Sequence, residues 1–204
     1  DLHWDEFHAW LTPRYLVFPS FGATVGAAGV VTLLPRLGAE LDESAFGFLE
    51  LVPGRITRTE FLDGEFSFVF WNLHLEEVDY DDALLARSLI QKDFSDARRC
   101  STRFFVVVAG DLNAAPSGSL KHKFAEPGVA FPVDPPSRER RVIIEALNEG
   151  VEVLPDFHSH YAKRENQTTH LDRIWFGAAP WVLDQLQVST VLVDEPVNLS
   201  KLRL

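Results

Sequence analysis

The sequence predicts an α+β domain in which helices cover the faces of β-sheets. Short apolar runs of strand type recur along the chain, and two long helical patterns interrupt them. The chain has 204 residues, of which 46% are hydrophobic, and this is enough to bury one sizeable core without requiring a second domain. We therefore expect residues 1–204 to form a single domain.

Eight runs have the composition of strands, with Val, Ile, Phe and Trp in short stretches bounded by glycine, proline or polar residues. The pair Asp63-Gly64 lies between two of these runs and is typical of a two-residue hairpin turn. Consecutive antiparallel strands are therefore expected on either side of it. The predicted strands are 27–34, 46–52, 56–62, 65–73, 103–109, 151–154, 173–176 and 186–193.

Two helices are predicted from periodicity and end signals. The pattern at 81–99 has apolar residues at i, i+4 spacing, aspartates at its start and arginines at its end, as the helix dipole favours. The pattern at 137–149 begins with Ser137 as N-cap and is followed by Gly150. A shorter helix is expected near 117–124, and loops are expected at 127–138 and 160–169.

Charge and composition narrow the function classes. The net charge is −11, from 19 Lys and Arg against 30 Asp and Glu, which argues against broad nonspecific adhesion to nucleic acid. A nuclease remains compatible, because a site for divalent cations itself needs carboxylates. No apolar run approaches the roughly 20 residues that span a bilayer. A single cysteine, Cys100, permits a reducing compartment and favours an intracellular over a secreted location.

The apolar strand that ends at residues 110–113, Gly-Asp-Leu-Asn, carries the first candidate site residues. Because side chains alternate along an extended backbone, Asp111 and Asn113 point the same way and can act on one ligand. A carboxylate can orient a water molecule or hold a cation, and a neutral amide can donate to a phosphate oxygen. The alternative is a simple turn after a core strand, since Gly, Asp and Asn are common turn residues.

A second apolar strand, 66–71, runs directly into Asn72-Leu73-His74. His74 can donate to a phosphoryl oxygen or protonate a leaving group; alternatively it is an edge histidine bonded to a backbone carbonyl.

A third run, 169–176, places Asp172 on the same strand face as Ile174 and Phe176, so this charge needs a partner. That partner is either a basic neighbour such as Arg173 or Arg55, or a catalytic histidine or bound cation.

These three segments, Asn72-Leu73-His74, Gly110-Asp111-Leu112-Asn113 and His170-Leu171-Asp172-Arg173-Ile174, resemble in their order the motifs of the endonuclease/exonuclease/phosphatase superfamily. The resemblance spans most of the chain. Three shorter segments are similar to the endonuclease domains of non-LTR retrotransposons, namely Ala28-Gly29-Val30, Pro53-Gly54-Arg55 and Ser159-His160-Tyr161.

The resemblance implies a four-layered α/β sandwich with two mostly antiparallel sheets flanked by helices. It also implies attack of an activated water on a phosphodiester or phosphomonoester with the help of Mg²⁺ or Mn²⁺. In that scheme Asp111 orients the water, Asn113 binds the scissile phosphate and His74 contacts or protonates it. The other two implied site residues are Asn72, which binds substrate, and Asp172, which orients a catalytic histidine.

Two family motifs cannot be placed in the sequence, a metal-binding Glu near the start and a Ser-Asp-His motif on the last strand. The metal ligands are therefore unknown, and we expect a chain truncated at both ends and inactive or nearly inactive by itself. The parent activity implied is a DNA endonuclease, with DNA as partner. Alternatives are a phosphatase of the same superfamily and a noncatalytic or decayed fragment.

Overall fold

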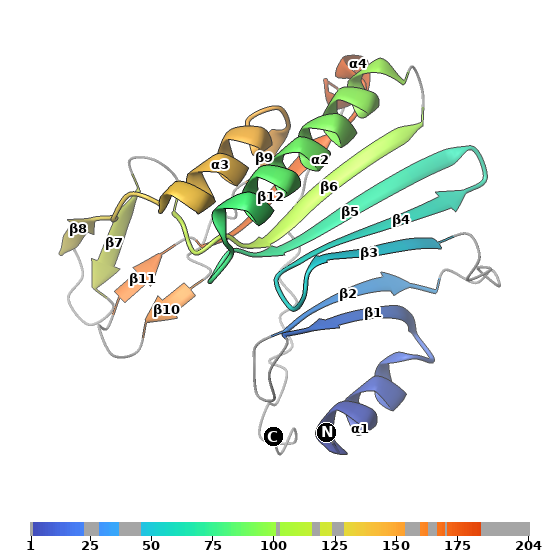
Figure 1. Ribbon diagram of the computed structural model, residues 1–204, viewed down its shortest axis with the longest axis horizontal. Coiled ribbons are helices and arrows are strands. Elements are labelled where there is room, and N and C mark those ends of the chain that lie inside the picture. The colour runs from blue at the N-terminus through green and yellow to red at the C-terminus, as the bar shows by residue number, and fades with distance from the viewer. Residues whose placement is uncertain are drawn as a thin grey trace.

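The computed structural model describes residues 2–22, 29–36, 46–100, 103–115, 119–123, 129–153, 160–162, 167–169 and 171–184 (Figure 1). Its described strands form three sheets. The six-stranded sheet has the order β3 (Phe46–Val52), β4 (Ile56–Asp63), β5 (Phe66–His74), β6 (Phe104–Asp111), β12 (Asp172–Gly177) and β9 (Val151–Val153). A two-stranded sheet pairs β1 (Tyr15–Phe21) with β2 (Gly29–Pro35). A four-stranded sheet has the order β10 (His160–Ala162), β11 (Gln167–Thr169), β7 (Leu120–Lys123) and β8 (Ala130–Pro132).

The long helices, the six-stranded sheet, the β1–β2 sheet and the first helix form successive layers, which Figure 1 shows nearly edge-on. The long helices α2 (Tyr80–Arg99) and α3 (Arg138–Leu147) cover one face of the six-stranded sheet. The β1–β2 sheet lies on the opposite side, and α1 (Leu2–Leu11) lies beyond it. A last single turn, α4 (Pro180–Leu183), follows β12. The predicted α+β class, with helix layers flanking two sheets, is confirmed.

Strand direction explains where the site can form. In the six-stranded sheet β5 and β6 are parallel neighbours, and every other pairing of that sheet is antiparallel. Parallel neighbours need a crossover, and α2 supplies it between β5 and β6. The C-terminal ends of β5 and β6 therefore lie side by side at one edge of the sheet.

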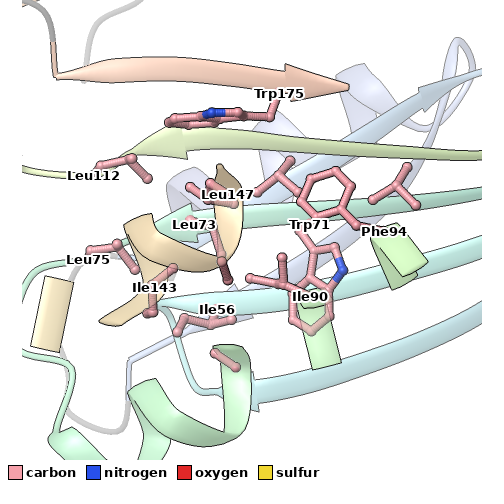
Figure 2. Packing of buried hydrophobic residues seen from close by; sticks show 14 of the residues in the cluster. Ile56, Trp71, Leu73, Leu75, Ile90, Phe94, Leu112, Ile143, Leu147 and Trp175 are labelled. Atoms are coloured by element: carbon pink, nitrogen blue, oxygen red, sulfur yellow. The ribbon is translucent and has the colours of Figure 1, made fainter. Parts of the chain in front are cut away.

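The hydrophobic core lies between the six-stranded sheet and the two long helices. Figure 2 shows Trp71 of β5 packed with Ile90 and Phe94 of α2, and all three are at most 1% exposed. Trp175 of β12 and Ile143 of α3 belong to the same cluster. Burying one large aliphatic or phenyl side chain contributes about 1.5–3 kcal/mol relative to exposing it. This face of the sheet thus holds the helices in place.

One buried ion pair crosses that core. Asp93 of α2 is 4% exposed and accepts two hydrogen bonds from the Arg58 guanidinium, from Nε at 2.8 Å and from Nη2 at 3.1 Å. It also accepts the indole N–H of Trp71 at 2.8 Å. Burial lowers the pKa of Arg58, but hydrogen bonds and charges from Asp93 and Glu60 outweigh burial, so the pKa is raised. The network fixes α2 against β4 and β5.

Polar contacts join the β1–β2 sheet to the six-stranded sheet. The Ser20 hydroxyl of β1 donates to Glu50 Oε1 at 2.5 Å and accepts from the backbone N–H of Gly54 at 2.6 Å. Ser20 is 1% exposed, so both bonds form away from solvent. The second sheet is therefore held by specific hydrogen bonds as well as by apolar packing.

Local sequence signals predicted most of these elements. The structure confirms strands at 46–52, 56–62, 65–73, 103–109, 151–153 and 173–176 and helices within 81–99 and 137–149, with Ser137 as the N-cap. The hairpin between β4 and β5 is also confirmed, with its turn at residues 64–65 and Gly64 at φ 59°. The predicted strand at 186–193 and residues 27–28 of the first predicted strand lie outside the described residues.

Three predictions were wrong. In place of a helix near 117–124, the described residues form strand β7, which pairs with β8 and β11. Helices this short are marginal in water, and pairing with neighbouring strands outweighs their propensity. The loops expected at 127–138 and 160–169 contain β8, and β10 with β11, respectively. These short strands lack the alternation of apolar and polar residues that identifies a half-buried strand.

Helix α1 and strand β1 were not predicted. The helix contains several aromatic residues and histidines, which are only moderate helix formers. It forms where Trp4 contacts Phe21 edge-on, with ring centroids 4.9 Å apart. Tertiary contact with β1 therefore accounts for this helix better than its local sequence does.

Candidate active site

Three of the predicted site residues form a row across the end of the six-stranded sheet. In the parallel β5–β6 pair His74 is the register partner of Asp111, and in the antiparallel β6–β12 pair Asp111 is the partner of Asp172. Neighbouring strands lie about 4.8 Å apart, so the three backbones are as close as a sheet allows. We call His74, Asp111 and Asp172 the polar row.

Alternation along the strands sets the face to which the polar row points. Leu73 and Trp175 are 1% and 2% exposed beneath the helices. His74 is the neighbour of Leu73, and Asp172 lies at odd spacing from Trp175, so both point to the opposite face. The polar row therefore lies on the sheet face that α2 and α3 do not cover, and Asp172 is exposed there.

Gly110 allows β5 and β6 to approach closely just before the polar row. It has φ 145°, and a Cβ at this position would lie 1.9 Å from the carbonyl oxygen of Leu73. Only glycine tolerates both the conformation and the contact. The glycine of the Gly-Asp-Leu-Asn segment therefore brings Asp111 beside His74.

Asn113 follows the strand in a left-handed turn. Its φ is 47°, a region that Asn enters more readily than most residues, and its backbone N–H donates to Asp111 Oδ1 at 2.7 Å. Its side-chain Nδ2 is buried and has no hydrogen-bond partner among the described residues. A buried amide donor without a partner is costly, and an acceptor oxygen of a ligand would satisfy it.

His74 is held in one tautomer by an arginine. Arg55 Nη1 lies 2.8 Å from His74 Nδ1, and because a guanidinium only donates, Nδ1 is the acceptor and Nε2 carries the proton. His74 Nε2 lies 3.5 Å from Glu76 Oε2, and Arg55 also donates to Glu77 Oε2 at 3.0 Å. The ring thus contacts charged side chains, and it presents an N–H donor on its outer nitrogen.

The two arginines considered as partners for Asp172 have other contacts. Arg173 is buried on the helix-covered face and forms an ion pair with Glu152, and Arg55 contacts His74 and Glu77. Asp111 and Asp172 are directly opposite each other in the ladder, an arrangement of like charges that is unfavourable in a sheet.

Asn72 lies two residues before His74 on the same face, where its side chain joins the two sheets. Its Nδ2 donates to the Val31 carbonyl at 3.1 Å and to Thr32 Oγ1 at 3.3 Å, both on β2. These two bonds use both hydrogens of the amide. Its predicted contact with substrate would therefore have to come from its oxygen.

Comparison with solved structures identifies the architecture. The endonuclease domain of TRAS1, a telomere-specific non-LTR retrotransposon, superposes with a TM-score of 0.51 at 13% identity, covering 88% of this chain and 74% of that domain. This is the fold of the endonuclease/exonuclease/phosphatase superfamily. The AP endonuclease LMAP from Leishmania major has a TM-score of 0.50 at 16% identity, over 85% of this chain. The matched part is 66% of LMAP, just under two thirds of its length.

The sequence comparisons do not add a closer relationship. No protein-family profile matches the chain, and no curated protein sequence matches it. The superpositions show a shared fold, and at identities of 13% and 16% the chemistry has to be argued from the site itself.

The donors of the polar row suit a divalent cation that is shared with a substrate. Among the described residues no group of three or more His, Cys, Asp or Glu side chains is arranged to hold a metal by itself. Mg²⁺ is commonly bound by one or two carboxylates together with substrate phosphates and water. Asp111 and Asp172, opposite each other on the face that α2 and α3 do not cover, match that requirement, and a cation there would offset their repulsion.

Sequence reasoning missed one residue at this edge, Arg140 of α3. Its Nε donates to the Leu75 carbonyl and its Nη1 to the Asn113 carbonyl, each at 2.9 Å. Arg138 and Arg141 lie close to it in the same helix, so local sequence offers no signal that distinguishes Arg140 from them. Arg55 was noted only as a possible partner for Asp172, although it contacts His74.

Proposed function

We propose that the chain carries the phosphate-handling site of a metal-dependent DNA endonuclease. The observation that carries this proposal is the polar row, with the buried Nδ2 of Asn113 following it in the chain. A proton donor, two carboxylates and an amide donor at one sheet edge are the groups that hydrolysis of a phosphodiester needs. Such hydrolysis depends on positioning and on neutralising charge more than on covalent chemistry.

The proposed roles follow from each residue's contacts. Asp111, whose Oδ1 accepts the Asn113 N–H, orients the attacking water with its carboxylate. His74, with its proton on Nε2, donates to a phosphoryl oxygen or to the leaving oxygen. The Nδ2 of Asn113 donates to the scissile phosphate, which would satisfy a buried donor. Asp172 orients a catalytic histidine outside the described residues or helps to hold the cation.

The Asp111 and Asp172 carboxylates are the groups we propose to hold Mg²⁺ or Mn²⁺ together with the phosphate. When bound, the cation supplies charge neutralisation for the phosphate and the two carboxylates. This requirement is acute here because the whole chain has a net charge of −11. Without a cation, the acidic molecule would repel a nucleic-acid backbone.

DNA is the substrate class we favour. Both structural neighbours described above are endonucleases by name, and the segments of this sequence that flank the three motifs resemble retrotransposon endonuclease domains. The alternatives are a phosphatase of the same fold and a noncatalytic derivative. The polar end of the sheet is common to proteins of this fold, so it does not distinguish these alternatives. The loops that contact the substrate differ among such proteins and decide which substrate is bound.

The test combines binding and cleavage, because we expect little or no turnover by this chain alone. Fluorescence anisotropy measures binding of a DNA duplex with and without Mn²⁺, and gel analysis measures nicking of supercoiled plasmid with Mg²⁺. The wild-type chain is compared with Asp111→Asn. Phe68→Leu, at the far end of the same sheet face, is the matched control.

Cation-dependent binding or nicking that Asp111→Asn abolishes and Phe68→Leu retains is the expected result. Binding without nicking also supports a phosphate-handling site with low turnover. Cation-dependent hydrolysis of p-nitrophenyl phosphate without any action on DNA would replace the endonuclease with the phosphatase. Absence of both cation-dependent binding and hydrolysis would exclude the proposal and favour a noncatalytic chain.

A further inference from the structure

We infer that Arg140 is a positioning residue of this site, which joins the loops after β5 and β6 and thereby sets Asn113 relative to His74. The inference rests on the function proposed above for those two residues. It assigns a task to a side chain that lies on a separate helix and contributes no group to the polar row.

The contacts of Arg140 reach both loops with one rigid group. Its Nε donates to the carbonyl of Leu75, the residue after His74, and its Nη1 donates to the carbonyl of Asn113, each at 2.9 Å. The guanidinium is planar, so the spacing between these two nitrogens is constant. The distance between the two carbonyl oxygens is therefore also restricted, and with it the distance between the loops.

Other hydrogen bonds hold the backbone N–H groups of the two loops, and Arg140 donates to the carbonyls of Leu75 and Asn113. The Leu75 N–H donates to the Asp111 carbonyl at 2.9 Å, and the Leu112 N–H donates to the Leu171 carbonyl at 3.0 Å. The Asn113 N–H donates to Asp111 Oδ1 at 2.7 Å. Arg140 supplies the donors for the carbonyls of Leu75 and Asn113, of which Leu75 is 1% exposed. Hydrogen bonds from a charged donor are stronger than those between neutral groups.

The conformation of Asn113 makes this restraint consequential. Residues with positive φ hold their conformation only when surrounding bonds determine it, and Asn113 has φ 47°. Its carbonyl is bonded to Arg140, and its N–H is bonded to Asp111. Loss of the bond from Arg140 leaves the peptide group after Asn113 free to rotate. This rotation would move the side-chain amide of Asn113, which we propose to contact phosphate.

Helix α3 is itself anchored close to Arg140. Ser137 caps its N-terminus by accepting the backbone N–H of Arg140 at 3.4 Å. Arg138 lies over the ring of Tyr80, the first residue of α2, at 3.9 Å from the ring centroid. Further along, Arg87 of α2 donates to Glu145 of α3 at 3.3 Å. The guanidinium of Arg140 thus extends from a fixed helix turn, as a positioning residue requires.

The test uses three variants of the complete chain: Arg140→Ala, Arg140→Lys and Arg141→Ala. Lysine keeps the charge and most of the stem but cannot bridge two carbonyls with a rigid fork. Arg141 is exposed on the same helix, so its removal controls for the loss of one positive charge. Hydrogen exchange at individual amides and steady-state nicking of plasmid are measured for each variant.

We expect exchange at the amides of Leu75, Leu112 and Asn113 to accelerate about tenfold in Arg140→Ala and in Arg140→Lys, as the loss of about 1.4 kcal/mol of local protection implies. The amides of Val106 and Val108, within β6, should exchange as in the wild type. The kcat for nicking should fall about 100-fold, the effect of a displacement near 1 Å, with KM changed less than kcat. Added guanidinium ion should restore part of the kcat of Arg140→Ala.

Unchanged exchange at the three loop amides in Arg140→Ala would overturn the inference, whatever happens to activity. Full recovery of exchange and kcat in Arg140→Lys would also overturn it, since charge alone would then suffice. An effect of Arg141→Ala equal to that of Arg140→Ala would have the same consequence. If loop exchange accelerates as expected but the wild type neither binds nor cleaves DNA, the positioning role stands and the proposed function fails.

Discussion

Two rows of side chains cross the face of the six-stranded sheet that α2 and α3 do not cover, and different interactions hold them in place. At one end Phe46, Phe61, Phe68 and Phe105 are successive register partners across β3, β4, β5 and β6. At the other end is the polar row. The two rows are six residues apart along β5 and β6, which is about 20 Å. We call the four phenylalanines the phenyl row.

The phenyl row is held by aromatic packing. Neighbouring ring centroids are 5.7, 4.7 and 5.2 Å apart, with interplanar angles of 30°, 14° and 19°. Aromatic pairs at these separations contribute about 0.5–1.5 kcal/mol each beyond their burial. Every member packs on the next, and Phe18 of β1 also packs on Phe46 with ring centroids 5.7 Å apart, so aromatic contacts hold the row.

The polar row depends on residues outside it. Arg55 holds the ring of His74, and the backbone N–H of Asn113 holds the carboxylate of Asp111. Asp111 and Asp172, directly opposite each other, are unfavourable neighbours. The two rows differ in how they are held: aromatic packing holds one end of this sheet face, whereas the proposed functional end depends on hydrogen bonds from residues outside the row.

The largest expected effect is on activity at the polar row. Asp111→Asn keeps the shape of the side chain and removes its charge, so the rate of plasmid nicking should fall on the order of 1000-fold, the range of general-base and electrostatic contributions. Initial rates with Mg²⁺ are compared with those of Phe68→Leu. Equal losses in both variants would mean that the two rows do not differ in function.

A second effect concerns the junction of β5 and β6. Gly110→Ala would place a Cβ 1.9 Å from the Leu73 carbonyl oxygen at φ 145°. We expect a loss of about 3 kcal/mol or more in the free energy of unfolding, because both the contact and the backbone conformation become strained. Chemical denaturation measures it, with Gly47→Ala as the control, where the nearest side-chain atom is 3.7 Å from the new Cβ. Similar losses in both variants would contradict the close approach.

A third, smaller effect tests the phenyl row. Phe68 is half-buried and stacks on Phe61 and Phe105. Phe68→Ala should lower the free energy of unfolding by about 2 kcal/mol, less than for a fully buried phenylalanine. Activity per folded molecule should stay unchanged, which is checked by nicking at a temperature where the variant is fully folded. A selective loss of activity in folded protein would show that the rows are coupled.

The smallest expected effect is on the stability of the polar row. Because Asp111 is directly opposite Asp172, Asp111→Asn should raise the free energy of unfolding by about 0.5 kcal/mol at pH 7 and low salt. The amide retains an oxygen that can accept the Asn113 N–H. Urea denaturation at low and high salt measures the change, which should shrink as salt screens the charges. A destabilised variant would indicate that Asp111 supports the fold.

Local sequence was sufficient to predict the elements that position the site. Short apolar runs predicted β5 and β6, and i, i+4 spacing predicted α2, because buried strands and helices leave these local patterns in the sequence. The ends of the apolar runs placed His74 and Asp111 at strand ends, and alternation placed Asp172 on the face of Ile174 and Phe176. The resemblance of the three motifs then predicted the superfamily fold that comparison with solved structures shows.

Other features depend on contacts between residues far apart in the chain. Helix α1 and the short strands β7, β8, β10 and β11 form where they pack or pair, with little local signal. The contact of Arg55 with His74 spans 19 residues, and that of Arg140 with Leu75 spans 65. The sequence around an arginine does not indicate which distant carbonyl or ring its guanidinium contacts in the folded protein.

The sequence by itself therefore determined the residues available for chemistry and the strand ends that carry them, because side-chain alternation is a local property of extended backbone. Only the tertiary structure decided that β5, β6 and β12 are neighbours in a register that aligns His74, Asp111 and Asp172. It also decided which arginines support them. Register and neighbourhood arise from packing of the whole core, in which burial of the helix-covered face excludes other alignments.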